Sequence, residues 1–71
     1  MSLETVRIPV EGMTCGSCAR TIERKLSARP GVTLAQVDLA SNLATVEFEA
    51  DRTRLADLVA AIQQLGYRVR L

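Results

Sequence analysis

The sequence predicts an α+β fold in which two helices cover one face of a four-stranded antiparallel sheet. The 71 residues suffice for one domain with a single modest core. Four short segments alternate apolar and polar residues, as half-buried strands do, and two longer segments carry an apolar stripe at helical spacing. The segments follow one another in the order β-α-β-β-α-β. Burying all their apolar faces together gives the ferredoxin-like arrangement.

The first half of the chain predicts a strand followed by a helix. Apolar and polar residues alternate over residues 5–10, which is typical of a half-buried strand. A loop with two glycines follows, and apolar spacing then predicts a helix over 17–29 with Cys18 on its apolar stripe and charged residues opposite. Pro30 and Gly31 end this helix with a turn.

The second half predicts a hairpin, a second helix and a last strand. Residues 35–39 and 44–49 both alternate, and a short polar turn joins them. The second helix starts near Asp51 or Thr53, either of which can cap it, and the final strand covers 67–71. The predicted core takes apolar residues from both helices and from the hairpin: Ile22, Leu26, Val37, Val46, Phe48, Leu55, Leu58 and Ile62.

The composition argues against several classes of protein. Nine Lys and Arg against eight Asp and Glu give a net charge of +1, too small a basic excess for binding nucleic acid. No run approaches the roughly 18–20 apolar residues of a membrane span, and the N-terminus lacks the apolar stretch of a secretory signal. We therefore expect a single cytoplasmic domain over residues 1–71, with no nucleic acid partner and no membrane insertion by this segment.

The chemistry of the chain is concentrated in its two cysteines, Cys15 and Cys18. Histidine is absent, so neither a Ser-His-Asp nor a Cys-His site can form, and we expect no enzyme. A closed zinc site would need two further Cys or His ligands, which the chain lacks. A thioredoxin-like redox pair stays open, although that fold needs a longer chain and another element order. Two incidental buried cysteines would suit Cys18 but not Cys15, which lies in a glycine-flanked loop.

A pair of exposed thiolates for a soft metal is the remaining interpretation. Cys15 in the loop and Cys18 in the first helical turn bring two sulfurs to a helix N-terminus. Free N–H groups and the positive end of the helix dipole favour thiolates there. Two thiolates without a nitrogen or carboxylate ligand select Cu(I) over Mg, Ca or Mn. A third thiolate from a partner can enter such a site, which suits delivery of the metal more than storage.

Several short motifs resemble those of the heavy-metal-associated domain. The stretch GMTCGSC over residues 12–18 is similar to the family's GMTCxxC signature. Four further motifs match in order: PGV (30–32), AQVDL (35–39), AxVxF (44–48) and LGY (65–67). The resemblance covers about residues 5–70, and the combination is far more specific than a CxxC pair alone.

The resemblance implies ligands and a metal. Cys15 and Cys18 would bind Cu(I) through two sulfurs in a near-linear arrangement, with Ag(I) as a mimic. Met13 would anchor the loop in the core, and its thioether is the alternative third donor. Relatives selective for Zn(II) carry Asp directly before the first cysteine, where this chain has Thr14. The resemblance therefore favours Cu(I) over Zn(II) or Hg(II).

The resemblance also implies roles for the surroundings of the metal. Thr14 and Ser17 would support the loop and the helix start, and Tyr67 would lie beside the site. Soluble bacterial chaperones often have His between the cysteines, and eukaryotic ones often have Lys where Tyr67 stands; this chain has neither. Arg20 and Arg24 have two interpretations, a solvated helix face or a basic docking surface for an acidic partner.

The family implies two contexts for the chain. One is the cytosolic N-terminal metal-binding domain of a copper-transporting P-type ATPase, which we favour, and the other is a free-standing cytosolic copper chaperone. In both contexts the expected partner is a copper chaperone or an ATPase domain of the same fold. We expect the metal-free protein to be a monomer. A thiol-disulfide redox protein is the alternative from a different functional class.

Overall fold

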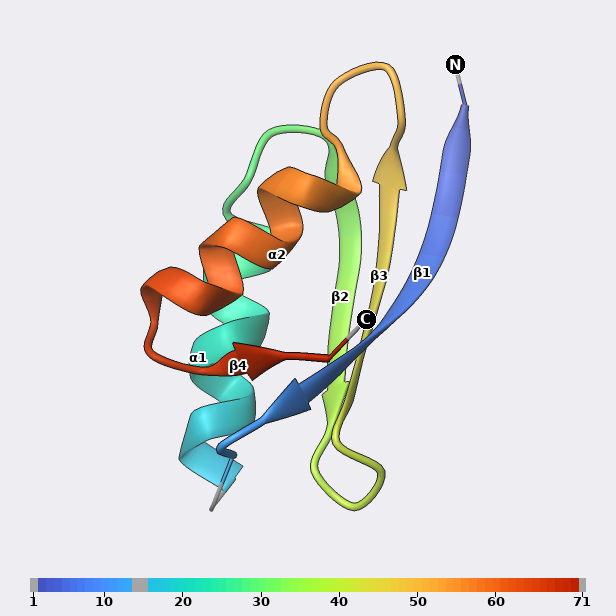
Figure 1. Ribbon diagram of the computed structural model, residues 1–71. Coiled ribbons are helices and arrows are strands. Elements are labelled where there is room, and N and C mark those ends of the chain that lie inside the picture. The colour runs from blue at the N-terminus through green and yellow to red at the C-terminus, as the bar shows by residue number, and fades with distance from the viewer. Residues whose placement is uncertain (1, 14–15, 71) are drawn as a thin grey trace.

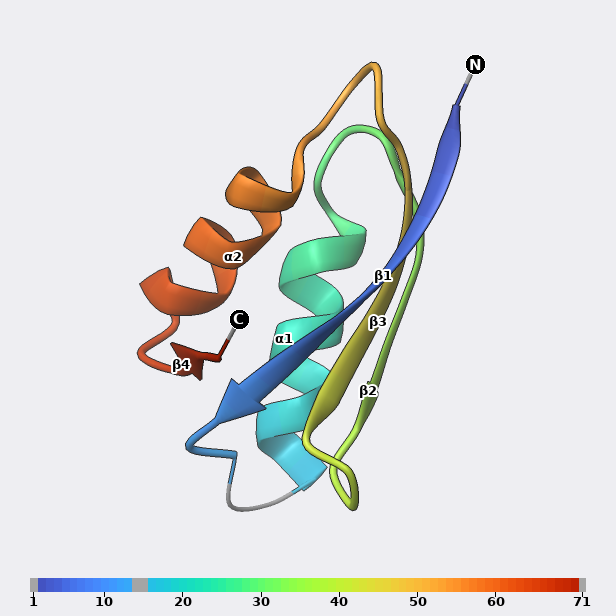
Figure 2. The ribbon, with the colours of Figure 1, turned by 45° about the vertical axis from the view of Figure 1, so that its right-hand side comes forward.

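A sheet and a layer of two helices make up the computed structural model, which describes residues 2–13 and 16–70. Its elements are β1 (Leu3–Glu11), α1 (Gly16–Ser27), β2 (Val32–Asp38), β3 (Leu43–Glu49), α2 (Leu55–Gln64) and β4 (Arg68–Val69). The strands form one antiparallel sheet in the order β2-β3-β1-β4. Both helices lie on the same face of this sheet (Figures 1 and 2). The predicted α+β, ferredoxin-like class is therefore confirmed.

The last strand is shorter than predicted, and Pro9 supplies the reason. β4 pairs with β1 only at Val10 and Glu11. The next position along the ladder places Arg70 opposite Pro9, and the Arg70 N–H donates to the Pro9 carbonyl at 2.9 Å. Proline has no N–H with which to return the second bond of that pair. Regular pairing therefore stops after Val69.

The hairpin between β2 and β3 turns next to the end of β1. Asp38 Oδ1 accepts the Ala40 N–H at 2.9 Å, which stabilises the turn through a side-chain contact two residues away. Asn42 takes the left-handed conformation, with φ of 56°, which asparagine tolerates better than most residues. The Asn42 carbonyl then accepts the Val10 N–H at 2.8 Å. This bond fixes the turn against the strand that leads into the CxxC motif.

Helix α1 ends at Ser27, two residues earlier than predicted. A tight turn through Pro30 follows, closed by the Val32 N–H, which donates to the Arg29 carbonyl at 3.2 Å. Gly31 has φ of +90°, and a Cβ built there would lie 2.8 Å from the Cβ of Arg52. Only glycine therefore fits this turn without displacing the loop that leads into α2.

Helix α2 starts at Leu55, later than predicted, and neither predicted cap is correct. The N-cap position is Arg54, whose backbone N–H donates to the Asp57 carboxylate at 3.3 Å. Thr53 instead turns inward and is 3% exposed, and its Oγ1 has no hydrogen-bond partner among the described residues. Apolar contacts at this position outweigh the capping preference of threonine. Neither helix of the described chain is long and apolar enough to cross a membrane.

The core lies between the sheet and the helices and agrees with most of the predicted residues. Of those, Leu55 is wrong, since it is 37% exposed at the first position of α2, and Val37 is only partly buried on an outer strand. The core also contains residues of the two central strands, β1 and β3, that were not predicted: Ile8, Val10 and Ala44. The buried core cluster is Ile8, Val10, Ile22, Leu26, Ala44, Val46, Phe48, Leu58, Ala61 and Ile62.

Candidate metal site

Residues 16–18, the described part of the CxxC motif, lie at one end of the molecule. β1 ends there at Glu11, α1 begins there at Gly16, and the turn of the β2-β3 hairpin lies beside them (Figure 1). We call this region the motif end and define it by Glu11–Met13, Gly16–Cys18, the turn 39–42 and Gly66–Tyr67. Thr14 and Cys15, predicted as loop support and first ligand, lie outside the described residues.

Gly12 begins the loop with a backbone that favours glycine. Its φ is +97°, in the left-handed region. A Cβ built at Gly12 would lie 3.6 Å from Cδ1 of Tyr67, which is ordinary contact. The structure therefore places the ring of Tyr67 directly against the start of the motif. This ring is half-buried and packs on the core at its other side.

Met13 connects the loop to the core. Its side chain is partly buried and packs against the core cluster. The role of Met13 as the anchor of the metal-binding loop stays a prediction. Because Met13 comes just before the predicted ligand pair, packing at this residue restrains the loop at its N-terminal side.

Cys18 is the third residue of α1 and lies at the border between core and solvent. Its side chain is half-buried, whereas Ala19, the next residue, is 8% exposed and Ile22 is fully buried. The first turn of α1 contains no acidic residue that would compete for the positive end of the helix dipole. The backbone thus presents the Cys18 sulfur at the N-terminus of a well-anchored helix.

Ser17 is exposed in the same turn. The hydrogen bond found at this residue runs along the helix, from the Thr21 hydroxyl to the Ser17 carbonyl at 2.9 Å. The supporting role that the resemblance implies for Ser17 stays a prediction, because residues 14–15 of the loop lie outside the described residues.

The donors available for a metal are few. Over residues 2–13 and 16–70, no group of three or more His, Cys, Asp or Glu side chains converges as a metal site would require. The whole chain has no histidine and two cysteines. The two cysteine thiolates, with the thioether of Met13, are the soft donors of the motif.

Arg20 and Arg24 project from the exposed face of α1 behind Cys18. They line a shallow depression together with Ser17 and Thr21. Within the described chain neither arginine forms an ion pair, since the two salt bridges found are Arg52–Glu49 and Arg70–Glu11. Two arginines without an ion pair in the described chain thus lie one turn apart on the exposed face of α1.

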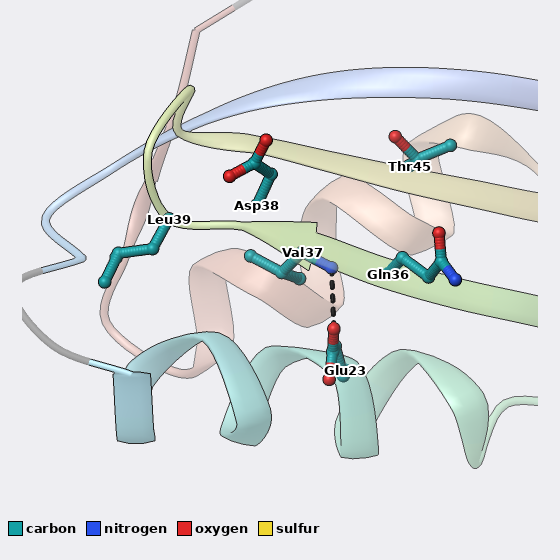
Figure 3. Close-up of a pocket in the computed structure, with 6 residues that line it drawn as sticks. All are labelled: Glu23, Gln36, Val37, Asp38, Leu39 and Thr45. Atoms are coloured by element: carbon teal, nitrogen blue, oxygen red, sulfur yellow. Dashed lines mark hydrogen bonds between the residues drawn. The ribbon is translucent and has the colours of Figure 1, made fainter.

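Glu23 is the residue at this helix that the sequence pattern misassigned. The charged residues of this helix are predicted to lie opposite its apolar stripe, but Glu23 is half-buried and its carboxylate accepts the Val37 N–H at 2.8 Å (Figure 3). A signal was present: Glu23 follows Ala19 by four residues and precedes Leu26 by three, so it lies on the edge of the buried stripe. A charged residue at such a position has to find a partner on the sheet.

Comparison with known proteins agrees with the fold and the motif. The family model described as the heavy-metal-associated domain matches residues 7–68. Copper-transporting ATPase 2 of Rhizobium meliloti (strain 1021) is 45% identical over 62 residues, which are 87% of this chain and 7% of that protein. The chain spans less than a tenth of the length of such curated relatives.

Solved structures give the same result. The N-terminal domain of a potential copper-translocating P-type ATPase from Bacillus subtilis, in its Cu(I)-loaded state, has a TM-score of 0.93 and 37% identity, over 99% of this chain and 88% of that chain. A CopZ metallochaperone has a TM-score of 0.92 and 31% identity, over 94% of this chain and all of that chain. Domains of this kind are small, non-catalytic, metal-binding modules. By sequence, motif and fold, the chain belongs to the heavy-metal-associated domain family.

Proposed function

We propose that this domain binds one Cu(I) between Cys15 and Cys18 and passes it to a partner by thiolate exchange. The observation that carries the proposal is the position of Cys18, half-buried in the first turn of α1 at the motif end. A helix N-terminus favours the thiolate form, and a thiolate pair without histidine favours a soft monovalent ion. The Cu(I)-loaded state of the similar Bacillus subtilis domain supports the same choice of metal.

Delivery follows from the small number of ligands. Two thiolates leave copper with room for a third sulfur, so a cysteine of the partner can attack the metal before either original bond breaks. A three-coordinate intermediate of this kind lets copper move in both directions, and neither protein holds it irreversibly. The half-exposed position of Cys18 supports this route, because a partner can approach the helix start from solvent.

The proposed context is the cytosolic N-terminal domain of a copper-transporting P-type ATPase. The identity to the Rhizobium ATPase and to the Bacillus domain supports it. A free-standing cytosolic chaperone is the second candidate, because the chain aligns with the whole length of a CopZ metallochaperone. In either case residues 1–71 act as one domain, monomeric without metal. The partner is a domain of the same fold.

A Cu(I) titration against a bathocuproine-type competitor tests the metal assignment. We expect one Cu(I) per chain, and Ag(I) should bind with the same stoichiometry. Cys15→Ser and Cys18→Ser should each abolish tight binding and leave the fold intact, whereas the matched control Ser17→Ala should bind normally. Stoichiometric binding by the double cysteine variant would disprove the assignment, and a protein that only cycles between dithiol and disulfide would be a redox protein instead.

Competition between metals tests the selectivity. We expect Cu(I) to displace Zn(II) completely, because two thiolates leave zinc short of its preferred four ligands. Hg(II) would also bind two thiolates, but we propose Cu(I) as the cargo. Thr14→Asp should increase the affinity for Zn(II), since it adds a carboxylate ligand next to Cys15. If Zn(II) binds the unmodified domain as tightly as Cu(I), the proposed selectivity is wrong.

The basic stripe of Arg20 and Arg24 is proposed as the docking surface for an acidic partner domain. Both side chains are exposed and free of ion pairs within the described chain. Such charges act mainly on the rate of association, and salt screens them. Replacing both by Glu should slow copper exchange with an acidic partner at low salt and leave the Cu(I) affinity unchanged.

A matched control for that experiment lies at the opposite end of the molecule. Arg52 and Arg54 are both exposed in the loop between β3 and α2, far from the motif end (Figure 1). Reversing this pair changes the net charge by the same amount and should alter exchange much less. If both double variants slow copper exchange equally, the net charge of the domain steers the encounter, and the position of Arg20 and Arg24 on α1 does not.

A further inference from the structure

The outer strand β2 presents a backbone edge that no strand of the described chain covers. The sheet order places β2 outermost, and it pairs only with β3, with Val37 opposite Ala44. The Val37 N–H is bonded to Glu23 and not to β3, which shows that it points away from the sheet. In an antiparallel ladder every second residue points the same way, so Ala35 shares this outer edge.

The side chain of Glu23, on α1, accepts a hydrogen bond from the outward-pointing Val37 N–H. Its Oε2 accepts the Val37 N–H at 2.8 Å, and Figure 3 shows the carboxylate rising from α1 to the strand. Neither Arg20 nor Arg24 forms an ion pair with it in the described chain. A carboxylate is a stronger acceptor for this N–H than the neutral carbonyl of an added strand would be.

The remainder of the edge is also unsuited to pairing. A register shift between Val32 and Leu34 interrupts the ladder at the start of β2. At the other end a shallow groove runs along the strand, and an added strand would have to lie in it. Its lining contains the carboxylates of Glu23 and Asp38, together with Gln36, Val37, Leu39 and Thr45. The incoming carbonyl oxygens would face the Glu23 carboxylate, which repels them.

We propose that Glu23 closes the β2 edge against strand addition, and that the partner it excludes is a second copy of this chain. Two β2 strands can pair antiparallel about a two-fold axis at Gln36, which sets the Val37 N–H of each copy opposite the Ala35 carbonyl of the other. Unprotected edges of this kind are the usual route to sheet-to-sheet association. In this proposal Glu23 prevents pairing between two β2 edges, and this role does not depend on which metal the domain binds.

Amide hydrogen exchange on the metal-free protein tests the protection directly. The Val37 amide should exchange at least about tenfold more slowly than the Ala35 amide on the same edge. Exchange of Val37 at the rate of Ala35 would overturn the proposal, and this measurement needs no variant.

Sedimentation of matched variants tests the association. Glu23→Ala should lose the slow exchange of Val37 and form dimers as the concentration is raised. Glu23→Gln, whose amide oxygen can still accept the N–H, should remain monomeric. Adding Val37→Pro to Glu23→Ala removes the edge donor at a position where proline is tolerated, and should restore the monomer. The proposal fails if Glu23→Ala stays monomeric when folded, or if its dimers persist after Val37→Pro.

Discussion

The core and the motif end both contain residues of α1, but these residues are buried in the core and at least partly exposed at the motif end. Ile22 and Leu26 of α1 are fully buried against the sheet, whereas Ser17 is exposed and Cys18 is half-buried. All the residues of the core cluster lie outside the GMTCGSC motif, and Met13 only packs against that cluster. The buried core and the proposed metal ligands therefore lie in different regions. We expect the domain to fold without metal, unlike a zinc finger, in which the metal supplies the folding free energy.

Phe48→Ala should be the strongest test of this separation. Phe48 is 2% exposed on the inner strand β3, and its truncation to Ala should lower the free energy of unfolding by about 3–5 kcal/mol. Urea unfolding of the metal-free protein measures the loss. The fraction that stays folded should still bind one Cu(I). A loss of binding within the folded fraction would show that core and site are coupled.

The two leucines of α2 sharpen the comparison within the core itself. Leu58 is fully buried, and Leu58→Ala should cost about 2–5 kcal/mol. Leu55 is 37% exposed, so Leu55→Ala should cost less than about 1 kcal/mol. Thermal unfolding of both variants gives the ratio. Similar losses would mean that Leu55 belongs to the core, as its spacing in the sequence predicts.

Glycine substitutions compare the two ends of the molecule. Gly31→Ala, at the end away from the motif, should cost about 2 kcal/mol, because the φ is positive and the new Cβ meets the Cβ of Arg52. Gly66→Ala has a positive φ but open space and should cost about 1 kcal/mol. Gly16→Ala, in the first turn of α1, meets nothing within 4 Å and should be neutral or stabilising. Chemical denaturation ranks the three, and any other order contradicts the geometry.

Thr53→Val should have a small effect of the opposite sign and stabilise the protein. The Thr53 hydroxyl is buried without a partner in the described chain, so replacing it by a methyl group should raise the free energy of unfolding by about 1 kcal/mol. Thr33→Val is the control, since the exposed Thr33 hydroxyl donates to the Glu47 carbonyl at 3.0 Å. That variant should be neutral or slightly less stable. Destabilisation by Thr53→Val would indicate a partner such as a buried water.

Most of the fold was predictable because each element carries its own periodicity. The alternation in β1 and β3 and the apolar stripe of α1 depend on local sequence alone, and all three elements were found. The errors arose where tertiary contacts decide the outcome. Pro9 on the neighbouring strand β1 shortens β4, and Thr53 is buried instead of capping α2, which starts at Leu55.

The candidate site shows the same division between local and distant information. The motif and its place at a helix start could be read from the spacing of two glycines and two cysteines. The contact between Gly12 and Tyr67 joins residues at opposite ends of the chain, and only the resemblance placed Tyr67 there. The bond from Val37 to Glu23 depends on which strand is outermost. A single sequence carries no direct signal of which strand lies at the edge of the sheet.

The contact of Tyr67 with Gly12 also gives the domain a built-in optical reporter. Tyr67 is the only tyrosine, and the chain has no tryptophan, so light that phenylalanine does not absorb excites this one ring. The ring touches the first residue of the motif at its Cδ1 side. Its emission therefore comes from a ring at the motif end, and we expect the arrival or departure of the proposed metal to change it in the unlabelled protein in real time.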